Sequence, residues 1–224
     1  MIFDCDGVLA DSELIACEVL AGFITRLGYP ITRDETVGRF LGRSLKDTHA
    51  VIEGLIGRAL GPDEGSAEAD CLLERFRAEL QPVAGVRDAI LAISGARCVA
   101  SSSTPARLRL SLELTGLLTL FDPRIFSATQ VERGKPAPDL FLLAAGTCGV
   151  VPRDCIVVED SPAGVRAAQA AGMPAIGFIG ASHATPALGE RLRAAGAATV
   201  IDAMTALPGA VAALQGGRLA RRAP

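Results

Sequence analysis

Four acidic side chains stand out because each directly follows a short apolar run of the sequence. Asp4 and Asp6 follow the run at the N-terminus, and Glu159 and Asp160 follow the run at 155–158. Carboxylates gathered in one pocket repel one another strongly unless a cation lies between them. Oxygen ligands without a neighbouring histidine or cysteine favour a hard ion, and Mg²⁺ is the natural one. Because bound Mg²⁺ prefers a phosphate oxygen as a further ligand, the pattern also indicates a phosphorylated ligand.

Donors for phosphate oxygens follow two further apolar runs. Ser101 and Ser102 come directly after the run at 97–100, and Lys135 follows the run at 125–128. A lysine supplies a point charge and hydroxyl groups supply hydrogen bonds to an anion. Taken singly, each strand end could serve only to cap the next helix, as the Ser161-Pro162 pair illustrates. Because four such ends carry chemistry together, we favour a functional site.

These residues need a scaffold that brings the ends of the apolar runs together. From Pro82 onward, short apolar runs alternate with amphipathic stretches that close near a glycine, which is typical of strands followed by helices. The predicted strands span residues 1–5, 97–100, 125–128, 155–158, 174–179 and 198–201, and the predicted helices 104–116, 137–149, 161–172 and 184–196. The pattern predicts an α/β fold with a doubly wound parallel sheet, whose strands all open on one ligand-binding edge.

A helical block interrupts this alternation after the first strand. Helical periodicity occurs at 12–28, 44–60 and 67–80, with no strand-like run between them. We therefore predict a core domain of residues 1–11 and 82–224 and an inserted helical cap domain of residues 12–81, placed to act as a lid.

Composition excludes several other classes of protein. The 224 residues carry 22 Lys+Arg and 25 Asp+Glu, a net charge of −3, and half of them are apolar, which argues against a disordered chain and against a nucleic-acid partner. The uncharged stretch at 167–189 is broken by glycines and prolines, so we expect no membrane span. The six scattered cysteines indicate buried thiols in a reducing compartment. We expect a cytoplasmic monomer.

The motifs FDCDGVLADSE, VASSS, GKPAPD and VVEDSPAGVRAAQAAGM, in this order, resemble the four signature motifs of the haloacid-dehalogenase superfamily of phosphohydrolases. The similarity spans nearly the whole chain and includes a helical cap after the first motif. Within the superfamily the chain is most similar to the branch of sugar-phosphate phosphatases and β-phosphoglucomutases, and its first motif to that of the bacterial 6-phosphogluconate phosphatases. The first motif begins at residue 2, whereas relatives usually have several residues before it, so we expect that the natural chain starts earlier and that the first strand is frayed at its start.

The resemblance implies roles for the matching positions. Asp4 would be the nucleophile that forms an aspartyl-phosphate, and Asp6 would be the general acid and base. Ser101, Ser102 and Lys135 would bind the phosphate. Mg²⁺ would be held by the Asp4 and Asp160 side chains and the Asp6 carbonyl, with Glu159 in or just beyond the coordination sphere. A bend at Gly7 would turn both aspartates toward the site.

Phosphatases and mutases share this core, and the cap distinguishes them. The related mutases carry a histidine, an arginine and a lysine where this chain has Ala16, Leu45 and no lysine between Lys46 and Lys135. The absence of these groups favours net hydrolysis over transfer between two positions of a sugar bisphosphate. In the cap, Gly42, Arg43 and Lys46, near Arg39, are the candidates for binding the rest of the substrate, which would suit an anionic sugar-acid phosphate; an exposed helix face is the alternative.

Two other classes remain as alternatives. A receiver module of a signalling protein also has an acidic sheet edge with a hydroxyl and a lysine, but its acid pair is adjacent and its phosphorylated aspartate lies two strands later. Dehalogenase chemistry needs no second aspartate, and Asp6 argues against it. His49 and His183 have no catalytic partner nearby in the sequence, so we expect them at the surface or as helix caps.

Overall fold

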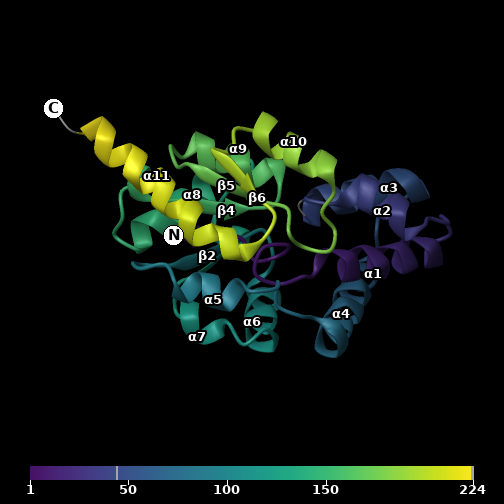
Figure 1. Ribbon diagram of the computed structural model, residues 1–224. Helices are drawn as coiled ribbons and strands as arrows, with labels where there is room; N and C mark the ends of the chain where they lie inside the picture. Colours follow the sequence, from purple (N-terminus) through teal and green to yellow (C-terminus); the bar gives the residue numbers. More distant parts are fainter. Residues whose placement is uncertain (44, 223–224) are drawn as a thin grey trace.

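The computed structural model describes residues 1–43 and 45–222, and at their centre lies a six-stranded sheet in the order β3-β2-β1-β4-β5-β6 (Figure 1). All neighbouring strands run parallel. The predicted doubly wound parallel sheet is therefore confirmed. Each predicted run overlaps a strand, and β2 and β4 each extend one residue beyond the predicted run; the bounds are β1 (Ile2–Phe3), β2 (Cys98–Ser101), β3 (Ile125–Ser127), β4 (Val157–Glu159), β5 (Ala175–Phe178) and β6 (Thr199–Ile201).

Helices cover both faces of the sheet. On one face lie α5 (Val86–Leu91), α6 (Pro105–Leu114), α7 (Leu118–Phe121) and α11 (Leu207–Arg222), and on the other α8 (Asp139–Thr147), α9 (Pro162–Ala170) and α10 (Pro186–Ala194). Successive strand side chains point to opposite faces, so Phe3 packs into the first core and Ile2 into the second. Burial on both faces explains why the strands read as continuous apolar runs rather than as alternating ones.

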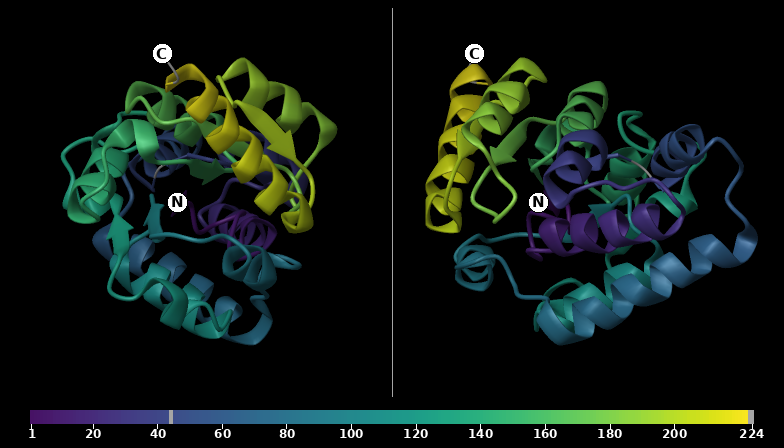
Figure 2. Two further views of the ribbon diagram at one scale, coloured as in Figure 1. Left: turned by 60° about the vertical axis from the view of Figure 1, so that its left-hand side comes forward. Right: turned by 90° about the vertical axis from the view of Figure 1, so that its right-hand side faces the viewer.

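Between β1 and β2 the chain forms the predicted helical cap. Its helices are α1 (Glu13–Arg26), α2 (Arg33–Phe40), α3 (Leu45–Ile56) and α4 (Pro62–Glu79). Figure 2 shows α1 and α4 running side by side. Apolar side chains of α1 build two small cores, one against α4 and one against α2 and α3.

Two features of the cap differ from the sequence prediction. Helix α2 was not predicted, because only Thr36 and Phe40 of its eight residues are buried and an apolar stripe is missing. Its local signal is a capping box, in which the Thr32 side chain accepts from Glu35 N and Glu35 accepts from Thr32 N. Helix α4 begins at Pro62, five residues before the predicted start at residue 67, because its first turn is polar.

The two segments that join the cap to the sheet run next to each other. Asp11 N donates to Gln81 O, and Val83 N donates to Leu9 O, both at 3.0 Å. The chain therefore leaves for the cap and returns from it at one place, close to the C-terminal end of β1. This placement puts the cap over the edge where the acidic residues lie.

No disulfide joins the six cysteines. None of the helices in the described part of the chain has the length and apolar character that a membrane span requires.

Candidate active site

The acidic residues meet where the strand order reverses, between β1 and β4. Asp4 and Asp6 follow β1, while Glu159 ends β4 and Asp160 comes directly after it. The crevice at such a reversal is where doubly wound sheets bind ligands. Carboxylate oxygens of Asp4, Glu159 and Asp160 lie within 4.8 Å of one another, close enough to share a metal ion. The sequence prediction that these side chains gather at one edge is thus met by the geometry.

Lys135 neutralises part of this charge. Its Nζ lies 3.1 Å from Asp4 Oδ1 and 2.5 Å from Glu159 Oε1, and it donates to Ala100 O at 3.0 Å. Burial lowers the pKa of the Lys135 ammonium, but the charges of Asp4 and Glu159 outweigh burial and leave it above its ordinary value. Of the three N–H donors of the ammonium, Glu159 Oε1 and Ala100 O accept two, and Asp4 is held by the ion pair.

Glu159 is held entirely by protein donors. Its side chain is fully buried, with Oε1 on Lys135 and Oε2 accepting from Ser161 N at 3.1 Å and Ser161 Oγ at 2.8 Å. Gly164 leaves room for it, because a Cβ there would lie 1.9 Å from Glu159 Oε1. Ser161 also caps α9 by accepting from Gly164 N. The helix-capping alternative and the site are therefore both present at this strand end.

Asp4 has an oxygen that the protein leaves unsatisfied. Its Oδ1 is buried and accepts no hydrogen bond, and its contact with Lys135 Nζ, 3.1 Å away, is an ion pair. Burial raises the pKa of Asp4 well above its ordinary value, and the negative charges of Glu159, Asp160 and Asp6 add to the effect that Lys135 opposes. Burial and Glu159 likewise raise the pKa of Asp160. A buried, oxygen-only cluster with excess negative charge and an unsatisfied oxygen fits a hard divalent cation.

Asp6 lies in the opposite electrostatic environment. Its Oδ1 accepts from Ser12 Oγ at 2.7 Å and from Arg107 Nη2 at 2.8 Å, and its Oδ2 accepts from Ser103 Oγ at 2.6 Å. Burial raises the pKa of Asp6, but the Arg107 charge and the serine hydrogen bonds outweigh burial and leave it below the ordinary value. In this arrangement Asp6 is an ionised hydrogen-bond acceptor with donors on both oxygens.

Gly7 allows the first motif to approach Asp160. Its φ of +70° lies in the left-handed region, and a Cβ there would lie 1.9 Å from Asp160 Oδ2. Because β1 ends at Phe3, the two aspartates lie in the turn that follows the strand, where Gly7 N donates to Ala10 O. The bend predicted at Gly7 is present.

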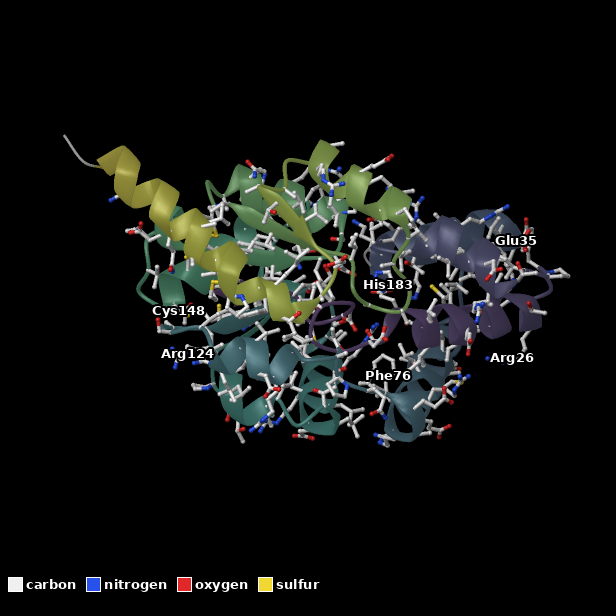
Figure 3. All side chains as sticks on the ribbon, in the orientation of Figure 1. Arg26, Glu35, Phe76, Arg124, Cys148 and His183 are labelled. Carbon is white, nitrogen blue, oxygen red and sulfur yellow. The ribbon has the colours of Figure 1, made fainter. Side chains whose placement is uncertain are left out.

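The expectation for His183 was wrong. Its side chain is only 1% exposed, and its Nε2 lies 3.1 Å from Asp160 Oδ2. Neither ring nitrogen has a hydrogen-bond partner among the described residues. Ser182 anchors the same loop by donating from N and Oγ to Asp11 Oδ1 at 3.1 and 2.7 Å. Residue 183 is remote from the motifs in sequence, so only the fold brings it to the acid cluster; Figure 3 shows it at the junction of cap and core.

The hydroxyl residues at the end of β2 and directly after it differ in burial. Ser101 is buried and accepts from Ser103 N at 3.2 Å, whereas Ser102 is exposed. Thr104 caps α6 and is followed by Pro105. Ser101, Ser102 and Ser103 all line the cavity described next, so the segment both caps a helix and faces the site.

A cavity of about 300 Å³ opens from the acidic cluster toward the cap. Gly42 and Arg43 line it, but Lys46 does not, and the Lys46 side chain is exposed. Ser44 of the same predicted element lies outside the described residues. Apolar cap side chains form much of the remaining wall: Ala16, Cys17, Leu20, Phe40, Leu41, Ala69, Leu72 and Leu73.

Three charged residues of this cavity were not predicted: Glu13, Glu68 and Arg107. Arg107 is in the first turn of α6, three residues after the Thr104 cap, and its guanidinium lies 5.1 Å from the centre of the Phe76 ring of α4. Glu13 is the last residue of the first motif. Those two positions could have been read from the sequence, because each opens a helix beside a strand end. Glu68 has no such signal, since it lies inside α4 and far from any motif.

Comparison with known proteins identifies the family of the chain. Residues 1–172 match the model of the haloacid dehalogenase-like hydrolases. The chain is 29% identical to the 6-phosphogluconate phosphatase of Escherichia coli, over 83% of this chain and 85% of that protein. It is 36% identical to hexitol phosphatase A of the same organism, over 84% and 86%. A haloacid dehalogenase-like protein of unknown function from Agrobacterium tumefaciens has a similar structure, with a TM-score of 0.84, 41% identity and coverage of 96% and 97%. The chain therefore belongs to the haloacid dehalogenase-like hydrolases.

Proposed function

We propose that the protein is a Mg²⁺-dependent phosphatase that hydrolyses a small sugar or sugar-derived phosphomonoester through an aspartyl-phosphate intermediate. The observation that carries this proposal is the environment of Asp4: its buried Oδ1 accepts no hydrogen bond and lies 3.1 Å from Lys135 Nζ, and carboxylate oxygens of Asp4, Glu159 and Asp160 lie within 4.8 Å of one another. The names of the phosphatases similar to this chain, which act on phosphorylated sugar acids and hexitols, support the substrate class.

In the first step an Asp4 oxygen attacks phosphorus, and the bond from phosphorus to the leaving oxygen breaks. Asp6 supplies the proton that the leaving alcohol requires. Ser101, Ser102 and Lys135 hold the phosphoryl oxygens and balance their charge. Asp6 must gain a proton for this step, and its three donors (Ser12, Ser103 and Arg107) oppose this because they stabilise the ionised form.

In the second step water attacks the phosphorus of the aspartyl-phosphate, and the Asp4–phosphorus bond breaks. Asp6 accepts the proton of that water, and inorganic phosphate leaves. An ionised Asp6 with a lowered pKa, as Arg107 and the two serines maintain it, is suited to this step. The same residue therefore has to alternate between two protonation states in one turnover.

Mg²⁺ would be held by the side chains of Asp4 and Asp160 and by the backbone carbonyl of Asp6. When bound, the ion supplies charge neutralisation for the acids and for the transferring phosphoryl group. We assign Glu159 to Lys135 rather than to the ion, because protein donors already occupy both of its oxygens. A bound cation would also offset the excess charge that raises the pKa of Asp4 and Asp160.

We also propose that residues 12–81 act as a cap that closes over residues 1–11 and 82–224. The paired connections at Asp11–Gln81 and Leu9–Val83 support a hinge there. A phosphosugar mutase stays the second candidate, since it shares the core. Hydrolysis is favoured over mutase activity at one of the positions that distinguish them. Where the related mutases carry a histidine, this chain has the neutral Ala16, which lines the cavity.

Rapid-quench kinetics with a ³²P-labelled substrate test this proposal. We expect acid-stable, base-labile label on the protein before steady state, and we expect Asp4→Asn to remove both the label and phosphate release while leaving the thermal unfolding midpoint within about 3 °C. EDTA should abolish release and Mg²⁺ should restore it. Full activity of the Asp4→Asn variant would refute the nucleophile assignment.

A further inference from the structure

The orientation of the Asp6 carboxylate is fixed in part by a residue outside the sequence motifs. Arg107 Nη2 donates to Asp6 Oδ1 at 2.8 Å from the first turn of α6, where Arg107 N also donates to Thr104 Oγ1 at 3.4 Å. Ser12 Oγ donates to the same Asp6 oxygen, and Ser103 Oγ donates to the other. Donors from different segments of the chain therefore hold Asp6 as a hydrogen-bond acceptor on both oxygens.

The guanidinium of Arg107 is itself positioned by the cap. Its Cζ lies over the Phe76 ring of α4, 5.1 Å from the ring centre. Its Nε is buried and has no hydrogen-bond partner among the residues that the structure describes. Phe76 is 1% exposed and packs in the small core that α1 and α4 share, which fixes the ring within the cap. Because a guanidinium is attracted to an aromatic face, the position of Arg107 depends on the cap.

The acceptor arrangement of Asp6 suits one of the two proton transfers of the proposed reaction. In the second step the water oxygen bonds to phosphorus, the Asp4–phosphorus bond breaks, and the proton of the water passes to Asp6. That step requires an acceptor oxygen in a fixed place, because a small displacement of a catalytic group costs much of its effect. In the first step Asp6 donates a proton, and a leaving group that departs as a stable anion does not need it.

We propose that Arg107 is a positioning residue for hydrolysis of the aspartyl-phosphate: it holds Asp6 in the orientation from which it accepts the proton of the attacking water, and Phe76 makes this orientation depend on the cap. The inference rests on the proposed phosphatase function and deepens it. Arg107 acts on the reaction through Asp6. Loss of Arg107 should therefore slow the second step and spare the first when the leaving group needs no proton.

Kinetics with ³²P-labelled 4-nitrophenyl phosphate test the proposal, because 4-nitrophenolate leaves as an anion. For this substrate kcat/KM reports the steps through phosphoryl transfer to Asp4, whereas kcat includes breakdown of the aspartyl-phosphate. In Arg107→Met, label already on the protein should be lost about tenfold more slowly in a chase, which is part of the roughly 10²–10⁴-fold that a general base supplies. We expect kcat and KM to fall together, with kcat/KM within about threefold of wild type.

Further variants assign the effect to the contact with Asp6. In an Asp6→Asn protein, which lacks the base, the addition of Arg107→Met should change the rate of label loss by less than about twofold. Arg107→Lys keeps the charge without the planar fork and should recover only part of the rate. Arg109→Met is the matched control on the same helix, because Arg109 is exposed in its ion pair with Glu113; it should leave all constants unchanged.

A substitution in the cap tests the dependence on Phe76. Phe76→Leu should slow label loss about threefold and leave kcat/KM unchanged, and it should have no further effect when Arg107→Met is present. Val19→Ala is the matched control, because Val19 belongs to the same small core of the cap but does not line the cavity. It should leave the rate of label loss unchanged.

The rate of label loss is measured on labelled protein alone, so it does not depend on how much of a variant is folded. An unchanged rate in Arg107→Met would overturn the inference, as would an effect of equal size in the Asp6→Asn protein. A parallel fall of kcat and kcat/KM with KM unchanged or raised would also overturn it, because Arg107 would then serve folding or substrate binding. Absence of label in the wild type would instead reject the proposed function itself.

Discussion

Arg107 Nη2 lies 2.8 Å from Asp6 Oδ1 and so joins helix α6 to the first motif. The guanidinium also lies 5.1 Å from the centre of the Phe76 ring, which is buried on the cap helix α4 (Figure 3). A single side chain of the core therefore contacts both the proposed acid–base residue and the cap. A movement of α4 that shifts Phe76 would therefore change the packing around the Arg107 guanidinium, which is hydrogen-bonded to Asp6.

Replacing Arg107 by methionine should lower the free energy of unfolding at pH 7 by about 3 kcal/mol, because Asp6 would become a buried charge without its partner. The native pKa of Asp6 lies below its unfolded value, so the stability it contributes is present above the unfolded pKa and is lost as pH falls through the native pKa. Urea unfolding should therefore show the difference between wild type and Arg107→Met shrinking below about pH 4.

Arg109→Met is the control for that measurement. Arg109 lies on the same helix but is 55% exposed in its ion pair with Glu113, so its loss should cost less than about 1 kcal/mol. Equal destabilisation by the two substitutions, or a difference for Arg107→Met that does not change with pH, would contradict the assignment of the buried ion pair.

The metal-free protein should lose stability as pH rises from about 5 to 8. Burial, and then the charges of Asp160 and Asp6, raise the pKa of Glu13 to about 8, and Asp4 and Asp160 are shifted in the same direction. Between the unfolded and native pKa values the native state binds more protons, so the free energy of unfolding falls with increasing pH. We expect a fall of at least about 1 kcal/mol, because one pKa unit corresponds to roughly 1.4 kcal/mol.

Thermal unfolding in EDTA across this pH range measures the effect. Saturating Mg²⁺ should reduce it, because a cation stabilises the ionised carboxylates and binds only the native state. A free energy of unfolding that rises with pH in EDTA would contradict the raised pKa values of these buried carboxyl groups.

His183→Leu should weaken binding of a divalent cation about tenfold. The imidazole Nε2 lies 3.1 Å from Asp160 Oδ2, so the ring restricts the position of that carboxylate, and burial lowers the pKa of His183, so the ring is neutral at pH 7. Groups that hold a metal ligand in place commonly contribute 10–100-fold to affinity. Mn²⁺ binding, followed by electron paramagnetic resonance without substrate, measures this independently of turnover.

His183→Gln keeps a side-chain N–H and should bind Mn²⁺ within about threefold of wild type. Unfolding in EDTA separates a loss of metal affinity from a general loss of packing at this buried position. Unchanged Mn²⁺ affinity in a folded His183→Leu protein would leave the contact with Asp160 without a role in metal binding.

The sheet and the acids at its edge follow from local patterns in the sequence. Apolar runs that end in Asp4, Ser101 and Asp160 are local patterns, and the parallel arrangement follows from their alternation with helices, so both could be predicted without knowing any long-range contact. The helical cap was predictable for the same reason, apart from α2, whose eight residues bury only two side chains and carry no apolar stripe.

The side chains around those acids come from distant parts of the sequence and are brought there by the fold. Arg107 binds Asp6 across 101 positions of sequence, His183 reaches Asp160 from the loop after β5, and Glu68 enters the cavity from the middle of α4. Their positions depend on how helices and loops pack over the sheet, and no local pattern encodes that packing. The motifs therefore identify the proposed reacting residues, whereas residues far apart in sequence determine the charge of the cavity around them.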